Sequence, residues 1–276
     1  MSGGPHYLFG LRSGVKCGHQ RAVDGVIHDG LWCAFGDAHM GGYAEYTAKK
    51  AGITREAQDR FALESHRKAV AAMEGCRFSA EIVKVEIPGR KGVTVVEKDE
   101  SPRTDTSLEA LAALKPAFEA TGTVTAGNAP GMNDGGSALV VTSEAFARAQ
   151  GLSPMARITA YATGGGEPRD LFFAPIVAVR NLMAKAGTSI RDYDLIEANE
   201  AFAVQALANG QALGWDWERV NVNGGAVALG HPIGASGARV LTTLLYAMRH
   251  RKASTGLATL CLGGGNAVAL SVERMS

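Results

Sequence analysis

Long apolar runs, clustered cysteines and net charge are all missing from this sequence. No window approaches the ~20 consecutive apolar residues of a membrane span. The N-terminal MSGGPHYLFG has neither the layout of a signal peptide nor the composition of a transit peptide. A formal net charge of +1 gives no reason to expect a nucleic-acid partner. Without a long apolar run we expect no membrane partner. The four cysteines form no CxxC pair and no metal-ligand spacing, so we expect no metal and reduced thiols in a cytoplasmic protein.

Glycine, in contrast, is abundant, with 35 among 276 residues, where about 7% is usual. From residue 155 onward, segments of strand and helix character alternate along the chain. The predicted strands are 155–161, 195–198, 220–222, 257–261 and 267–272. The predicted helices are 175–186, 200–213 and 234–249. This βαβαβαββ order predicts one layered α/β unit, and we expect glycines 164–166 to form a flexible surface loop.

The first half of the chain has a less regular pattern. Residues 1–42 are glycine-rich and irregular. Thr54 is a suitable N-cap for a helix that ends near residue 73. Alternation of valine and isoleucine with charged residues predicts an exposed hairpin over 81–98, with its turn at residues 88–92. We also predict a short helix over 107–114 and a strand over 138–142.

His231 lies in Gly230-His231-Pro232, just before a predicted helix. Pro232 favours an extended conformation at His231 and then suits the first turn of a helix, because it has no N–H to lose. We therefore expect an imidazole beside a helix N-terminus, where it can do acid–base chemistry. A His-Pro turn on its own is more often purely structural.

Cys261 ends an apolar run just before Gly263-Gly264-Gly265-Asn266. The glycines predict a tight hairpin between two buried strands, and their N–H groups can form an anion-binding concavity. A single buried cysteine is more often a small core residue. If it is functional, we expect a nearby imidazole or helix dipole to lower its pKa from ~8.5, so that it can carry a proton near neutral pH.

Three segments together resemble the signatures of the thiolase family: GHPIGASG, CLGGGNA and the upstream Asn199-Glu200-Ala201-Phe202. Their order and spacing also match, and the resemblance extends from Met1 to Glu273. It implies an acetyl-CoA C-acetyltransferase or 3-ketoacyl-CoA thiolase type of acyltransferase in fatty acid metabolism. Such an enzyme catalyses the reversible Claisen condensation and thiolysis of acetoacetyl-CoA or another 3-ketoacyl-CoA. The resemblance further implies coenzyme A thioesters as substrates, no cofactor, and a homo-oligomer, either a dimer or a tetramer.

The same resemblance assigns catalytic roles to four positions. His231 takes the proton of the nucleophilic cysteine, and Cys261 removes or returns the α-proton of acetyl-CoA. Asn199, through a water, and His231 stabilise the enolate oxygen. The N–H of Gly263 contributes to a second oxyanion hole. Glu200 has two open interpretations, as part of this signature or as a plain carboxylate at a helix start.

Further positions are implied to bind the coenzyme A thioester. They are His39, Met40, Arg103, Phe118, Ala129 and Phe202. Arg103 is expected near the coenzyme A phosphates, although a solvated surface cation is the commoner role for such a residue. Pro130 replaces a serine of the family pattern, which removes a hydroxyl that would contact the pantetheine chain.

The family carries its nucleophilic cysteine in an N-terminal half-domain that would precede Met1. The resemblance therefore implies a thiolase-like layered fold whose C-terminal half is complete and whose N-terminal half is largely missing. The expected domains are a loop domain at 1–132 with its hairpin at 81–98, a remnant of the N-terminal half at 133–151, and the C-terminal half at 152–276. Without its partner half, the helix after His231 should leave apolar surface uncovered.

Two other functions are compatible with these residues. The chain could be a catalytically incomplete thiolase fragment or a non-enzymatic acyl-CoA-binding module, since no nucleophilic cysteine is evident. It could also be another condensing enzyme of the same fold, such as a ketoacyl synthase. Those enzymes pair their cysteine with two histidines, so Cys261 at a glycine-rich hairpin disfavours that class.

Overall fold

A computed structural model of the chain describes residues 1–90 and 92–275. The C-terminal half is built on a four-stranded sheet of order β7-β10-β9-β8. Its strands are β7 (Ala156–Gly165), β8 (Leu195–Ala198), β9 (Thr255–Leu262) and β10 (Asn266–Arg274). β10 pairs antiparallel with both β7 and β9, and β8 pairs parallel with β9. The predicted layered α/β unit is therefore confirmed.

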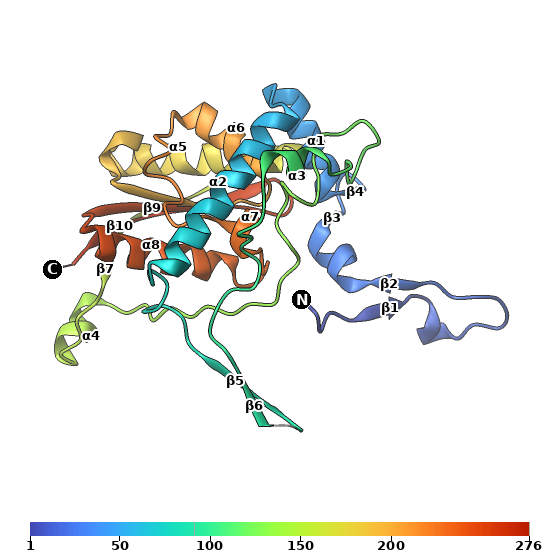
Figure 1. Cartoon of the computed structure of the whole chain (residues 1–276), viewed down its shortest axis with the longest axis horizontal. Helices are drawn as coiled ribbons and strands as arrows, with labels where there is room; N and C mark the ends of the chain where they lie inside the picture. The colour runs from blue at the N-terminus through green and yellow to red at the C-terminus, as the bar shows by residue number, and fades with distance from the viewer. Residues whose placement is uncertain (91, 276) are drawn as a thin grey trace.

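Helices cover both faces of this sheet (Figure 1). The helices of this half are α5 (Ala174–Ala186), α6 (Ala203–Leu213), α7 (Ala226–Leu229) and α8 (Ser236–Arg251). Side chains that alternate along β8 and β9 point to opposite faces. Ile196 and Leu257 pack with α5, whereas Leu195 and Ala258 pack with α8. Three layers result, with a core on each side of the sheet.

The first half adds helices on the α6 side, a further short helix near the start of β7, and two hairpins that extend away from the body (Figure 1). Its helices are α1 (Met40–Ala51), α2 (Arg55–Glu74), α3 (Leu108–Ala112) and α4 (Glu144–Ala149). Its strands are β1 (His6–Leu8), β2 (Ala22–Asp24), β3 (Trp32–Cys33), β4 (Ala38–His39), β5 (Val85–Gly89) and β6 (Gly92–Val96). Four short non-α helical turns are η1 (Leu11–Ser13), η2 (Val26–Leu31), η3 (Pro168–Phe173) and η4 (Ile190–Asp192). The exposed hairpin is confirmed as β5–β6, although Lys91 of its predicted turn lies outside the described residues.

Three expectations about local structure are wrong. Residues 138–142 form no strand, and Val140 is 94% exposed. Residues 220–222 make only single bridges, because Asn221 adopts a left-handed φ of 44° that no continuous strand accommodates. Glycines 164 and 165 are the end of β7 rather than a loop. A Cβ on Gly164 would lie 2.3 Å from the backbone nitrogen of Ala178, so this glycine allows α5 to pack directly on the strand.

Helix α8 is covered on one side only. Val240, Leu244 and Met248 are buried against the sheet. On another side, Leu241 and Leu245 are only partly buried and line a groove of about 490 Å³ together with Val140 and other residues. Among the residues that the structure describes, α8 thus keeps an incompletely covered apolar side. No described helix combines the length and the apolar character that a membrane span would need.

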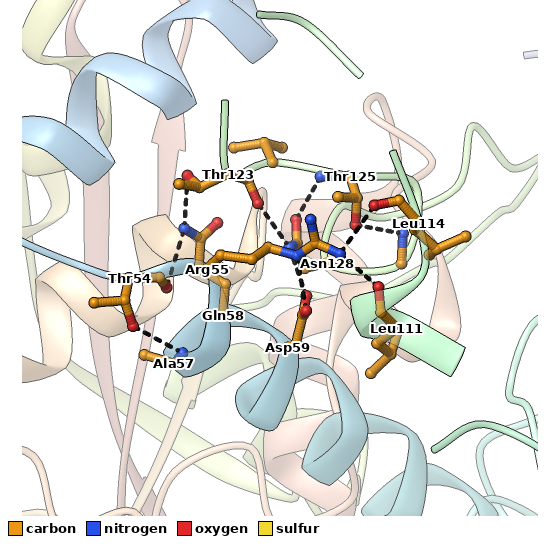
Figure 2. A network of polar contacts seen from close by, with 12 residues as sticks. Thr54, Arg55, Ala57, Gln58, Asp59, Leu111, Leu114, Thr123, Thr125 and Asn128 are labelled. Carbon is orange, nitrogen blue, oxygen red and sulfur yellow. Dashed lines mark hydrogen bonds and ion pairs between the residues drawn. The ribbon is translucent and has the colours of Figure 1, made fainter. Parts of the chain in front are cut away.

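A buried polar network fastens the loop that leads to Ala129 onto α2 (Figure 2). Asp59 of α2 accepts hydrogen bonds from Arg55 Nε at 2.7 Å and from Asn128 Nδ2 at 2.9 Å. Asn128 is fully buried, and its Oδ1 accepts a hydrogen bond from the backbone N–H of Thr125 at 2.8 Å. Its carbonyl accepts one from the N–H of Ala203 at 3.0 Å, at the start of α6. Two segments that border the site described below are therefore tied to α2.

We predict that Asp59→Ala lowers the free energy of unfolding by about 3 kcal/mol, because it removes the charged acceptor that a buried amide and a mostly buried guanidinium share. The melting temperature should fall by roughly 6–12 °C. Arg60→Ala is the matched control, since Arg60 pairs on the same helix with Glu56 and both side chains are exposed. It should change stability by less than about 0.5 kcal/mol. Equal losses in the two variants, measured by thermal unfolding, would contradict the anchoring role.

Candidate active site

A cavity of about 390 Å³ lies between the two halves of the chain and contains most of the residues expected from the sequence. The expected residues that line it are His39, Met40, Phe118, Ala129, Phe202, His231, Cys261 and Gly263. Most of its remaining walls are apolar and include Leu31, Met132, Leu171 and Phe172. The imidazole of His231 and the thiol of Cys261 thus meet at one cavity, although thirty positions separate them in the sequence.

His231 is held between α7 and α8 by contacts on both of its ring nitrogens. Nδ1 lies 2.5 Å from Ser236 Oγ, and Nε2 lies 3.3 Å from Asn199 Nδ2. Its backbone N–H donates to the carbonyl of Gly131 at 3.3 Å. Burial, assisted by the positive charge of Arg239, lowers the pKa of His231 to about 4. The ring is therefore neutral at pH 7 and can accept a proton.

Asn199 directly follows β8 and is 1% exposed. Its backbone N–H donates to the carbonyl of Thr259 at 3.0 Å, which aligns the ends of β8 and β9. Its Oδ1 is buried and has no hydrogen-bond partner among the described residues. The structure therefore brings Asn199 to His231, with one polar atom still free to bind.

Glu200 is fully buried and does not begin a helix, since α6 starts at Ala203. Its carboxylate accepts hydrogen bonds from Ser65 Oγ at 2.8 Å, Asn221 Nδ2 at 2.8 Å and the N–H of Val227 at 3.0 Å. Burial raises the pKa of Glu200. The interpretation as a plain helix-start carboxylate is wrong, because Glu200 connects α2, the 220–222 segment and α7.

Cys261 lies near the end of β9, and the predicted glycine hairpin follows it. Gly264 and Gly265 have φ values of 76° and 84°, a conformation that favours glycine. Burial raises the pKa of the Cys261 thiol to about 12. Our expectation of a lowered pKa is therefore wrong in direction, since removal from water outweighs any favourable dipole. At rest the site holds a neutral thiol and a neutral imidazole.

Aromatic rings form one wall of the cavity. The ring centroids of His39 and Phe118 are stacked 5.0 Å apart, and Phe202 meets Phe118 edge-on at 6.2 Å and Phe172 at 5.3 Å. Nδ1 of His39 accepts a hydrogen bond from the N–H of Gly41 at 2.9 Å and thereby caps α1. A Cβ on Gly41 would lie 2.3 Å from the ring of Phe118, so only glycine permits this stack.

Two expected site residues do not line the cavity: Asn199 reaches it through His231, whereas Arg103 lies away from it. Its side chain is exposed, and its backbone N–H donates to His66 Nδ1 at 3.1 Å. Conversely, one residue that contacts the site was not predicted: the sequence did not indicate Ser236 as a partner of His231. A serine in the turn after a His-Pro pair was the only available signal.

Comparisons with known proteins agree with this geometry. The family model for the thiolase N-terminal domain matches residues 1–145, and that for the thiolase C-terminal domain matches residues 152–274. An acetyl-CoA acetyltransferase of Pseudomonas aeruginosa is 55% identical over 275 residues, which cover 99% of this chain and 70% of the relative. An acetyl-CoA acetyltransferase of Escherichia coli K12 is 53% identical over 277 residues, which cover 100% of this chain and 70% of that relative.

A solved structure, that of the Bacillus anthracis acetyl-CoA acetyltransferase, superposes with a TM-score of 0.96 at 44% identity. The match covers 98% of this chain and 68% of that one.

The N-terminal match does not support our expectation that the N-terminal half is largely missing. Segment 1–132, which we expected to be a separate loop domain, lies within the residues that match the N-terminal domain. That expectation came from the family resemblance, and in the structure α1 and α2 pack directly against α6 of the other half. The boundaries 1–132, 133–151 and 152–276 themselves stay predictions.

We predict that alkylation of Cys261 by iodoacetamide accelerates about tenfold between pH 8 and pH 9, because its thiolate fraction grows by that factor well below a pKa near 12. An ordinary thiol with a pKa of ~8.5 gains only about threefold over the same interval. Peptide mass spectrometry follows Cys261 and the exposed Cys17 in the same sample. Poor access alone would slow Cys261 at both pH values equally, so a threefold gain there would refute the raised pKa.

Proposed function

The chain belongs to the thiolase family, and from that premise we propose that it is an acetyl-CoA C-acetyltransferase that catalyses the reversible condensation and thiolysis of acetoacetyl-CoA or another 3-ketoacyl-CoA. The observation that carries the proposal is the convergence of His231, Cys261 and Gly263 on one largely apolar cavity, with Asn199 bonded to His231. The names of the curated relatives support the same reaction and do not favour a non-enzymatic module.

The aromatic and apolar wall is suited to a thioester chain. Met40, Phe118, Ala129 and Phe202 offer apolar contact along the cavity, and His39 is stacked within it. Pro130 lines the cavity too and offers neither a hydroxyl nor an N–H, so the thioester loses one possible polar contact there. Arg103 remains a proposed partner for the coenzyme A phosphates, from a surface position outside the cavity.

In the thiolysis direction, His231 Nε2 takes the proton of the attacking thiol, whose sulfur bonds to the 3-keto carbon. The bond between carbons 2 and 3 breaks, and its electron pair forms the enolate of the departing acetyl-CoA. Cys261 then gives its proton to carbon 2. Its raised pKa suits this donation, because the resting group is a thiol at pH 7. The thiol of coenzyme A next takes over the acyl group: its proton goes to the Cys261 thiolate, and His231 returns its proton to the departing sulfur, so that both groups are neutral again. Condensation runs the same steps in reverse.

The remaining groups stabilise the developing charge. Asn199 and His231 act on the enolate oxygen, and the N–H of Gly263 acts on the tetrahedral oxyanion. Donors of this kind are worth about 2.7–4 kcal/mol each. Among the described residues, Cys261 is the only cysteine that lines the cavity, so we assign the attacking thiol to none of Cys17, Cys33 and Cys76.

Two parts of the proposal do not depend on the geometry of the site, the first resting on the resemblance and the second on the cysteine pattern and the N-terminal sequence. They are assembly into a homo-oligomer, as a dimer or tetramer, and a place in the cytoplasm.

We predict that His231→Ala and Cys261→Ser each lower kcat for acetoacetyl-CoA thiolysis by at least about 100-fold, the usual contribution of a general acid or base. Cys17→Ser is the matched control, because it removes an exposed thiol and should leave the rate unchanged. The decay of the enolate absorbance of acetoacetyl-CoA measures the rate. Activity that both site variants retain would refute the assignment of these residues, and an inactive wild-type protein would refute the function.

We also predict that kcat/KM for thiolysis stays level down to about pH 5 and falls only toward pH 4. The proton acceptor must be neutral imidazole, and the lowered pKa of about 4 keeps His231 neutral until then. Full recovery of the rate on return to pH 7 is the control for acid unfolding. An acid limb near pH 6.5, the ordinary histidine value, would contradict the lowered pKa.

A further inference from the structure

Ser236 makes two side-chain hydrogen bonds at the start of α8, and it is 1% exposed. Its Oγ donates to the carbonyl of Pro232 at 3.0 Å. The same Oγ lies 2.5 Å from Nδ1 of His231. Ser236 is absent from the cavity lining, so it reaches the site only through the imidazole.

The number of protons in this chain of contacts fixes the state of the ring. A serine hydroxyl has one hydrogen, and the hydrogen bond to the carbonyl of Pro232 uses it, because a carbonyl oxygen can only accept. The oxygen can therefore only accept from His231, so Nδ1 must carry the proton. On the other side of the ring, the amide nitrogen of Asn199 can only donate, so Nε2 must accept. Both neighbours require the same tautomer.

We propose that Ser236 is a positioning residue that holds neutral His231 with its proton on Nδ1 and its lone pair on Nε2. The tautomer itself depends only on the contacts above, whereas its value for catalysis rests on the proposed function. With the proton on Nε2 instead, the ring could not accept a proton from a thiol in the cavity. A histidine base needs such a partner because the bond at one nitrogen decides the role of the other.

Backbone contacts alone do not select the tautomer of His231, so the side chain of Ser236 must do so. The N–H of Gly230 donates to the carbonyl of Ala226 at 2.8 Å, the N–H of His231 donates to Gly131, and the proline ring fixes the next φ. These contacts place Cα and Cβ of His231, but they do not distinguish its two tautomers. Arg239 lies one turn further along α8 and is paired with Glu197 at 3.1 Å, so it contributes charge and no hydrogen bond to the ring.

Nitrogen NMR can read the tautomer without any turnover. We would label the histidine rings with ¹⁵N and record two-bond ¹H–¹⁵N correlations at pH 7, with His231→Gln to identify the His231 signals among the seven histidines. We expect wild-type His231 to show a protonated Nδ1 and an unprotonated Nε2. Ser236→Ala should increase the population with the proton on Nε2, and Ser236→Thr should restore the wild-type pattern by returning a hydroxyl.

Ser271→Ala is the matched control. Ser271 is 2% exposed, and its hydroxyl also makes two hydrogen bonds, to Thr159 Oγ1 and to the carbonyl of Ala160, but it lies on β10 outside the cavity lining. It should cost similar stability and leave the His231 signals unchanged. A wild-type ring with its proton on Nε2, or a Ser236→Ala ring that keeps the wild-type pattern, would overturn the proposal.

Kinetics separate this inference from the proposed function. Ser236→Ala should lower kcat for thiolysis about tenfold or more with little change in KM, Ser236→Thr should recover most of it, and Ser271→Ala should keep the wild-type rate. If the tautomer shifts as expected but the wild-type protein has no thiolase activity, the positioning role stands and the proposed function fails. If the wild-type protein is active and Ser236→Ala keeps its kcat, the positioning role fails alone.

Discussion

The site depends on one buried carboxylate. Glu200 has no counter-ion among its contacts, and it is held by three donors from three different segments. A buried carboxylate is tolerable only when such donors replace water, so Ser65, Asn221 and Val227 must each stay in place. Gly225 has to be glycine for the same reason, since a Cβ there would lie 2.2 Å from the carboxyl carbon of Glu200. This one requirement fixes α7, from which the chain continues directly to His231.

Burial also decides the chemistry of the cavity. It lowers the pKa of His231 and raises that of Cys261, because in both groups it disfavours the charged form. An ion pair of thiolate and imidazolium is therefore not the resting state. A neutral pair offers one acceptor and one donor for protons, which is what a reaction needs when a thiol attacks and an enolate leaves. Each group becomes charged only when the reaction supplies or removes a proton.

Periodicity predicted the elements whose stability is local or whose pattern is simple. The helix expected to begin after Thr54 and the β9–β10 hairpin are present almost as predicted, since capping and glycine turns act over a few residues. The strand predicted at 220–222 is absent because Asn221 has a left-handed backbone. That conformation follows from its contacts with Ala198 and Glu200, which come from another segment. Likewise, the pKa of Cys261 depends on side chains that only the fold places around it, and no sequence pattern contains that information.

The cavity belongs to both halves of the chain. His39 and Phe118 come from the segment that matches the N-terminal domain, whereas Phe202, His231 and Cys261 come from the segment that matches the C-terminal domain. The contact between Phe118 and Phe202 joins the two, and Asn128 links them again through the first N–H of α6. A change in either half therefore moves the aromatic wall relative to the proton-transfer groups. Asp59 can therefore affect binding without touching a substrate, because its hydrogen bond to Asn128 positions the loop that leads to Ala129 in the cavity wall.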